Sequence, residues 1–181
     1  MIELLPFTEA DVDRLLGWVQ SREDFLFWAA ATLEYPLTHE GMKVHLEQSA
    51  RAGDRRIFKS VDTETLEAVG YLEFTLINQQ NRSLRISRVV VDPAARGRGF
   101  GGAMMQEALK ISFGELGVHR AELGVFHVNP GAIACYERVG FRQEGVRRDS
   151  FKVPEENSYW SEVVMSILAP EWAPFAEPRK P

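Results

Sequence analysis

The sequence predicts one mixed α/β domain, built on a six- to seven-stranded, mostly antiparallel sheet with about four helices. The 181 residues are close to the usual size of a single domain, and 45% of them are apolar, which is enough for a core. Helical and strand-like apolar patterns follow one another along the chain without strict alternation. Helices therefore separate some strands and not others, which indicates a mixed sheet and not a doubly wound one.

The first third of the chain predicts a strand and two helices. Ile2–Pro6 is a short apolar strand. Thr8 is suited to cap a helix over 10–19, where apolar residues recur with a helical period. Residues 21–36 are rich in aromatic side chains and irregular, so no regular element is expected there. A second helix is expected over 38–53.

The middle of the chain predicts a meander of three strands followed by a crossover. Short turns join the strands expected over 56–62, 68–77 and 84–91, so these strands should pair antiparallel. A helix over 99–113 then leads to a strand over 120–128. A strand–helix–strand connection of this kind implies that strands 84–91 and 120–128 are parallel.

The last third predicts a helix and a hairpin. Pro130–Val139 is a helix with proline at its first position, as helix starts favour. Residues 141–153 and 159–168 form a final strand pair, and the proline-containing tail over 169–181 is expected to be coil. All of these elements are assigned to one domain, 1–181.

Composition argues against several classes of function. The net charge of -5 disfavours non-specific binding of nucleic acid, and no apolar stretch approaches the roughly 20 residues that span a membrane. The first six residues lack the features of a secretory leader, and a lone Cys135 cannot form an internal disulfide, so a cytoplasmic protein is expected. The four histidines show no metal-ligand spacing, so no metal is expected.

A glycine-rich turn is the most informative segment. Residues 96–102, Arg-Gly-Arg-Gly-Phe-Gly-Gly, lie between a predicted strand and a predicted helix. Backbone N–H groups in such a turn converge on an anion, and glycines let a pyrophosphate approach closely. Gly97-x-Gly99-x-x-Gly102 also satisfies a dinucleotide fingerprint, but that motif belongs to an opening βαβ unit, whereas three meander strands come first here.

Two segments resemble the GNAT family of N-acetyltransferases. Arg96-x-x-Gly99-x-Gly101 is similar to the acetyl-CoA signature of that family, and Asn129 to Phe141 resembles its Asn-x-x-Ala-x-x-x-Tyr-x-x-x-Gly-Phe segment. The region of Trp28 and the closing residues 166–172 resemble the branch that acetylates ribosomal-protein N-termini.

The resemblance implies a fold and a reaction. It implies that the two central parallel strands splay apart and hold acetyl-CoA between them. The implied reaction is direct acetyl transfer in a ternary complex, from acetyl-CoA to the primary amine of a protein N-terminus or a small molecule. Dimers are common in this family, so the resemblance is compatible with a homodimer, although the sequence does not show the oligomeric state.

The resemblance also assigns site residues. The backbone at 89–91 would pair with the pantetheine amides, the turn at 96–102 would hold the pyrophosphate, and Tyr136 would protonate the departing thiolate. Asn129 would either contact the pantetheine arm or cap the following helix. The expected cofactor contacts are Val89, Val90, Val91, Arg96, Gly97, Arg98, Gly99, Phe100, Gly101, Gly102, Asn129, Ala132 and Tyr136.

The base that takes the proton of the acceptor amine is less clearly marked. Family members often carry a glutamate at positions that correspond here to Arg85 and Gly124, and neither residue can serve as a base. Glu73 is the candidate, because a neighbouring strand could aim it at the same cleft. Glu122, His127 or a chain of water molecules are alternatives.

Aromatic residues and one arginine are expected at the acceptor. Trp28, Phe27 and Tyr35 could form an apolar wall or a cation–π surface for an ammonium group. Arg85 and Arg88 differ in parity along one strand, so at most one of them should face the cleft.

Two other functions are compatible with the sequence. The absent family carboxylates would suit a CoA-binding sensor or regulatory module without turnover. The glycine spacing alone would suit a nicotinamide-dependent oxidoreductase.

Overall fold

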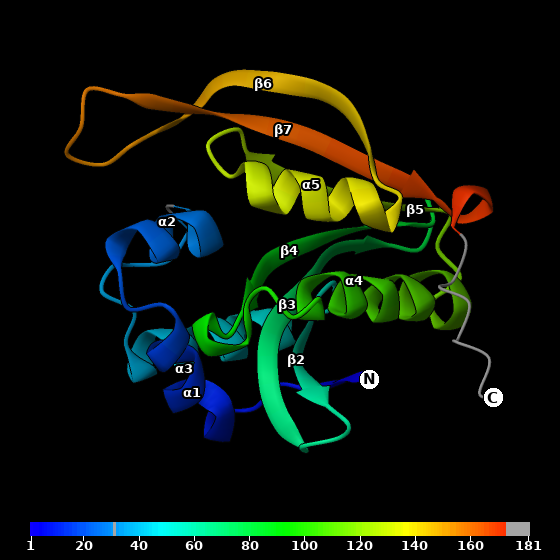
Figure 1. Cartoon of the computed structure of the whole chain (residues 1–181), viewed down its shortest axis with the longest axis horizontal. Coiled ribbons are helices and arrows are strands. Elements are labelled where there is room, and N and C mark those ends of the chain that lie inside the picture. Colours follow the sequence, from blue (N-terminus) through cyan, green and yellow to red (C-terminus); the bar gives the residue numbers. More distant parts are fainter. Residues whose placement is uncertain (31, 173–181) are drawn as a thin grey trace.

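A computed structural model describes residues 1–30 and 32–172, which form a seven-stranded mixed sheet with helices on both faces (Figure 1). The strands are β1 (Ile2–Pro6), β2 (Arg56–Asp62), β3 (Glu67–Asn78), β4 (Ser83–Val91), β5 (Arg120–Phe126), β6 (Arg142–Lys152) and β7 (Tyr159–Leu168). The helices are α1 (Val12–Trp18), α2 (Arg22–Ala29), α3 (His39–Ala52), α4 (Phe100–Lys110) and α5 (Pro130–Val139).

The sheet confirms the predicted mixed topology. Its strand order is β1-β2-β3-β4-β5-β7-β6, and β4 with β5 is the parallel pair among otherwise antiparallel neighbours of the described chain. Helix α4 is the crossover that this parallel pairing requires. A dinucleotide-binding fold needs several parallel strands in succession, so the topology excludes the nicotinamide alternative.

The parallel pair is short, and this shortness creates the site. Residues 83–85 of β4 pair with residues 120–122 of β5, and the rest of the two strands is not paired with each other. The central strands therefore splay apart, as the family resemblance implies.

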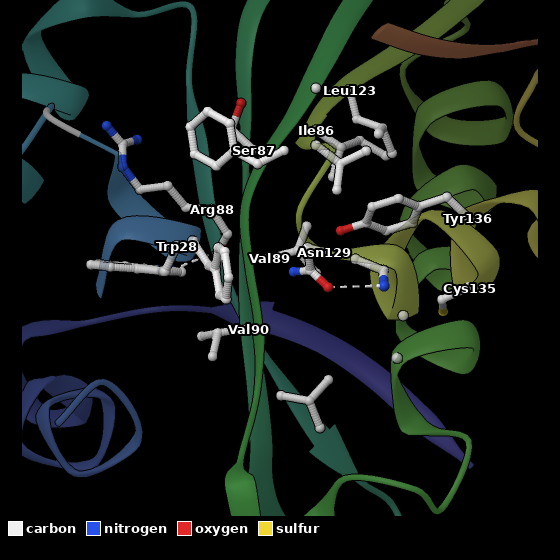
Figure 2. A pocket seen from close by; sticks show the side chains of 18 of the residues that line it. Trp28, Ile86, Ser87, Arg88, Val89, Val90, Leu123, Asn129, Cys135 and Tyr136 are labelled. Carbon is white, nitrogen blue, oxygen red and sulfur yellow. Dashed lines mark hydrogen bonds between the residues drawn. The ribbon is translucent and has the colours of Figure 1, made fainter. Parts of the chain in front are cut away.

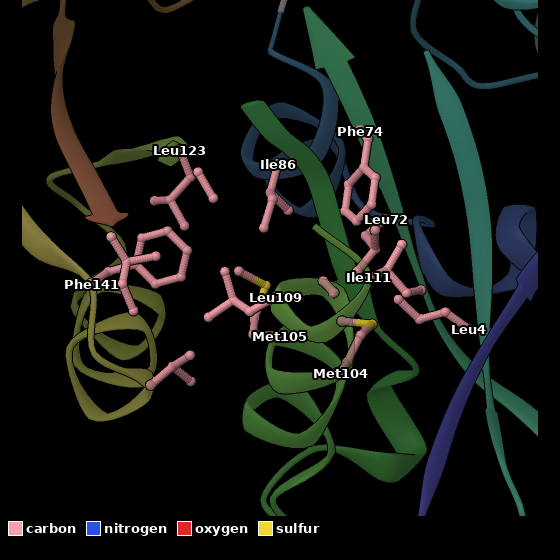
Figure 3. Packing of buried hydrophobic residues seen from close by; sticks show 14 of the residues in the cluster. Leu4, Leu72, Phe74, Ile86, Met104, Met105, Leu109, Ile111, Leu123 and Phe141 are labelled. Atoms are coloured by element: carbon pink, nitrogen blue, oxygen red, sulfur yellow. The ribbon is translucent and has the colours of Figure 1, made fainter. Parts of the chain in front are cut away.

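Two apolar cores lie on opposite faces of the sheet. One core contains Met104, Met105 and Leu109 of α4 and residues of α5 (Figure 3). The other contains residues of α1, α2 and α3. Adjacent Tyr71 and Leu72 of β3 belong to different cores, because successive side chains of a strand point to opposite faces.

Helix α2 corrects the expectation that residues 21–36 are irregular. The side chain of Ser21 caps the helix by accepting a hydrogen bond from the backbone N–H of Asp24, and Phe25 and Trp28 are buried beneath it. The apolar residues of α2 are consecutive, from Phe25 to Ala29, so they show no helical period, and burial against the sheet stabilises the helix. With α2, the described residues contain five helices, one more than expected.

Smaller differences concern the ends of elements. Helix α4 ends at Lys110 and continues as a π-type turn over Ile111–Glu115, where a single helix over 99–113 was expected. Strand β5 ends at Phe126 and not at 128. Ala169–Glu171 forms a 3-10 turn at the start of the expected coil tail, whose residues 173–181 lie outside the described residues.

Gly70 marks a close approach between the sheet and α4, and we predict that Gly70→Ala destabilises the protein. A Cβ at Gly70 would lie 2.8 Å from the carbonyl oxygen of Val90 and 3.0 Å from the sulfur of Met104. Overpacking of this kind costs about 1–3 kcal/mol, which urea denaturation would measure. Gly17→Ala is the control, because a Cβ at this exposed position of α1 meets nothing within 4 Å and should stabilise by up to about 1 kcal/mol. Equal stability of Gly70→Ala and the wild type would contradict the prediction.

Candidate active site

A large cleft opens where β4 and β5 part (Figure 2). Its volume is about 1540 Å³, more than the roughly 300–1,000 Å³ of a typical small-molecule pocket, so it has room for two ligands at once. Residues of α2, β3, β4, α4, β5, α5 and β7 line it, together with the glycine-rich turn.

The glycine-rich turn forms one end of the cleft. Gly97 and Gly99 have φ of 77° and 85°, a conformation that glycine adopts without strain, and Gly99 is the N-cap of α4. The first N–H groups of α4 have no partner within the helix, so they are free to bind an anion. Added Cβ atoms at Gly97, Gly99 and Gly102 would meet nothing within 4 Å, which shows that the space beside the turn is open.

Most of the turn residues expected at the cofactor line the cleft. These are Arg96, Gly97, Gly99, Phe100, Gly101 and Gly102. The structure corrects the expectation for Arg98, which does not line the cleft. Its guanidinium lies over the Phe100 ring, 4.9 Å from the centroid.

A bulge in β4 shapes the side wall. Tyr71 of β3 lies opposite Val90, but Glu73 lies opposite Ser87, so a single β3 residue faces two residues of β4. Arg88, at the bulge, has φ of 48°, and its carbonyl oxygen accepts a hydrogen bond of 2.8 Å from Nε1 of Trp28. Beyond the bulge, Val89, Val90 and Val91 all line the cleft, as expected.

The bulge also corrects the parity argument for the two arginines. Arg85 and Arg88 were expected on opposite faces of β4, with at most one in the cleft. Both line the cleft, because the extra residue at the bulge reverses the alternation of side chains after Ser87.

Tyr136 of α5 extends its hydroxyl into the cleft toward β4 (Figure 2). Burial, and to a lesser extent neighbouring Cys135, raises the pKa of Tyr136, so its hydroxyl stays protonated at neutral pH and can donate a proton. Asn129 caps α5 by accepting a hydrogen bond of 3.1 Å from the backbone N–H of Ala132, and both residues line the cleft. The cap and the cofactor contact considered for Asn129 are therefore compatible.

Glu73 does not face the cleft, which corrects the expectation that β3 aims it there. Its side chain is fully buried and accepts hydrogen bonds from Tyr71 and from Nε2 of His45 at 2.8 Å, and it forms an ion pair of 2.6 Å with Arg88. Burial alone would raise the pKa of Glu73, but the hydrogen bond from His45 and the charge of Arg88 outweigh it and hold this pKa below its ordinary value. Oε2 of Glu73 thus binds Arg88, and Oε1 binds His45 and Tyr71, so both carboxylate oxygens are engaged.

The alternative bases also lie outside the cleft lining. Glu122 forms ion pairs with Arg120 at 3.1 Å and with Arg85 at 3.6 Å. His127 accepts a hydrogen bond at Nδ1 from the backbone N–H of Ser161.

The three aromatic residues expected at the acceptor behave differently. Trp28 and Phe27 line the cleft, whereas Tyr35 does not, because its half-exposed ring packs on Phe25 with 5.2 Å between centroids.

The partners of two α2 residues were not predicted from the sequence. Phe27 lines the cleft and stacks on Trp160 of β7, with centroids 5.2 Å apart, so α2 is joined to the β6–β7 hairpin. Asp24 forms an ion pair of 3.2 Å with Arg96 of the glycine-rich turn. These partners lie 72 or more positions apart in the sequence, so no local sequence pattern predicts that they meet.

Among the described residues, no group of three or more His, Cys, Asp or Glu side chains is arranged to hold a metal ion. No described helix has both the length and the apolar content needed to cross a bilayer.

Comparison with known proteins matches most of this chain to one family. Residues 15–141 match the sequence model of the acetyltransferase (GNAT) family. The spermidine N(1)-acetyltransferase of Vibrio cholerae is 35% identical over 77 residues, which are 42% of this chain and 44% of that protein. The N-alpha-acetyltransferase RimI of Mycobacterium tuberculosis is 36% identical over 74 residues, 41% of this chain and 44% of that protein. The matches thus span less than half the length of these curated relatives.

A solved structure shares the fold. The spermidine N-acetyltransferase from Vibrio cholerae, in complex with CoA and spermine, superposes with a TM-score of 0.82. The superposition covers 94% of this chain and 96% of that chain at 24% identity.

Replacing Glu73 should destabilise the protein in a pH-dependent way. Glu73→Gln leaves the Arg88 guanidinium buried without its counter-charge, at an expected cost of about 3–5 kcal/mol. The pKa of Glu73 is lower in the folded than in the unfolded protein. Ionised Glu73 therefore contributes to the free energy of unfolding above the ordinary glutamate pKa of about 4.3. This contribution is lost as the pH falls through the pKa that Glu73 has in the folded protein.

Urea denaturation from pH 3 to pH 7 would test this prediction. The stability of Glu73→Gln should depend less on pH than that of the wild type. Exposed Glu67→Gln on the same strand is the control and should stay within about 0.5 kcal/mol of the wild type. The prediction is wrong if Glu73→Gln unfolds at the same urea concentration as the wild type.

Asp24 forms an ion pair with Arg96 and would compete with an anionic ligand for it, so Asp24→Asn should strengthen CoA binding. An exposed ion pair contributes about 0.2–1 kcal/mol, so the Kd should fall by up to about fivefold in calorimetric titration at low salt. Glu23→Gln removes the same charge from the same turn of α2 without releasing Arg96. An equal gain in both variants would indicate a general charge effect and contradict the assignment.

Proposed function

Because this chain belongs to the acetyltransferase (GNAT) family, we propose that it transfers the acetyl group of acetyl-CoA to a primary amine. The acceptor would be a small molecule or the N-terminus of a protein. One observation carries the proposal: a glycine-rich anion site and the hydroxyl of Tyr136 line the same cleft, where the central strands part.

The cleft suits acetyl-CoA, whose thioester supplies an activated acetyl group. The turn amides and Arg96 would hold the pyrophosphate, where the open space beside Gly97 and Gly99 leaves room for it. Residues 89–91 of β4, which have no strand partner on the β5 side, would pair their backbone groups with the pantetheine arm.

Tyr136 would act as the general acid. A thiol with a pKa near 8.5 is a fair leaving group, so one positioned proton donor is enough to assist it. A tyrosine hydroxyl is already protonated at neutral pH, and the raised pKa of Tyr136 leaves it so.

The acceptor would enter from the sheet face that carries α2. Trp28, Phe27 and Arg88 line that part of the cleft and would contact it. Strand β6, at the edge of the sheet, would offer an exposed surface for a homodimer, with which the family resemblance is compatible.

Tyr136→Phe tests the proposed function. Loss of the general acid should lower kcat by about 10²–10⁴-fold, while the Kd of CoA stays within a few-fold of the wild-type value. Release of the CoA thiol would be followed with a panel of N-terminal peptides, amino acids, polyamines and aminoglycosides. Tyr35→Phe is the control, because that ring lies outside the cleft lining. If the wild type binds CoA tightly but releases no thiol with any acceptor, the protein is a sensor and the proposal is overturned.

A further inference from the structure

Three carboxylates of the described chain line the cleft: those of Glu23, Asp24 and Glu162. Glu23 is exposed on α2, and Asp24 is bound to Arg96 beside the glycine-rich turn. Glu162, on β7, reaches the point where β4 and β5 begin to part, since it forms an ion pair with Arg85, the last β4 residue paired to β5. Of these three carboxylates, that of Glu162 is the one that pairs with Arg85, where β4 and β5 begin to part.

Gly124 of β5 makes room for Glu162. In the register of β5 and β7, Gly124 lies opposite Val164, and Glu162 lies opposite Phe126. The Glu162 side chain leans along the sheet and covers Gly124, so that a Cβ at position 124 would overlap its carboxylate and the guanidinium of Arg85. The carboxylate thus occupies the space that a side chain on β5 would otherwise fill.

Glu162 and Tyr136 approach the split from opposite faces of the sheet. Leu123 and Val125 point into the core beneath α4 and α5, so Gly124 and the carboxylate above it face the other way. Tyr136 packs against that same α4–α5 core and reaches the cleft from its side. A group lying in the gap would therefore have the Tyr136 hydroxyl on one side and the Glu162 carboxylate on the other.

The ion pairs of Glu162 leave it accessible to a cationic ligand. Its side chain is 16% exposed, and Arg147 binds it at 2.8 Å while being itself 65% exposed. Such an exposed partner contributes little, so an incoming ammonium group can take its place. Arg85 remains to orient the carboxylate.

We infer that Glu162 receives the ammonium group of the acceptor and accepts its proton. This inference rests on the proposed function and supplies the base that it lacks. One proton moves from the acceptor nitrogen to a Glu162 oxygen, and the freed lone pair forms the C–N bond with the acetyl carbon. The C–S bond breaks, Tyr136 gives its proton to the thiolate, and the new amide nitrogen loses a proton that restores the tyrosine. Glu162 then releases its proton to solvent.

Glu162→Gln separates this role from a purely structural ion pair. At pH 7 we expect kcat/KM to fall about 10²-fold while the Kd of CoA is unchanged. The deficit should shrink as the pH approaches the pKa of the acceptor amine, because solvent then supplies the neutral amine. Glu122→Gln is the matched control, since Glu122 also pairs with Arg85 but does not line the cleft, and it should retain activity within about threefold.

Glu162→Asp distinguishes loss of the base from misfolding of the Glu162→Gln variant. It keeps the carboxylate on a shorter side chain and should lower kcat while preserving the wild-type pH profile. The inference is overturned if Glu162→Gln stays within threefold of the wild type, if its loss is the same at every pH, or if Glu122→Gln loses as much. A wild type that releases no thiol with any acceptor would instead overturn the proposed function, and this inference with it.

Discussion

The buried ion pair between Glu73 and Arg88 holds β4 in the shape on which the site depends. Arg88 adopts a positive φ at the bulge, a conformation that a long side chain avoids unless its surroundings compensate. Glu73, itself held by Tyr71 and His45, anchors the guanidinium, and Trp28 binds the carbonyl oxygen of the same residue. This bulge follows closely on Arg85, the last β4 residue that pairs with β5.

The parting of β4 and β5 then makes both faces of the sheet available to one cavity. Unpaired backbone groups of β4 line the gap, the first amides of α4 close one end of it, and α5 brings Tyr136 from one face. The other face is bordered by α2 and the β6–β7 hairpin, joined through Phe27 and Trp160. Asp24 on the same helix reaches Arg96, so the acceptor side and the anion site share α2 as a common wall.

Local patterns were enough to predict most elements. The bounds of β1, β2, α5 and β7 were predicted to the residue, because each element carries a clear period or a proline start. Helix α2 was missed, since its residues are chosen for packing against β4 and the hairpin and show no helical stripe of their own. The prediction that Arg85 and Arg88 lie on opposite faces of β4 was wrong for a related reason. A bulge inserts one residue that no sequence pattern reveals, and every later side chain of the strand then lies on the other face of the sheet.

The sequence by itself determined the strand and helix order, the anion-binding turn at 96–102 and the segment that carries Tyr136, because each depends on residues that are neighbours in the chain. Only the tertiary structure decided which carboxylates reach the cleft. Glu73 is drawn into a buried pair with a residue of another strand, and Glu162 enters from β7 over the bare backbone of Gly124. Side chains that meet across strands are placed by register and bulges, and these are settled by the packing of the whole sheet.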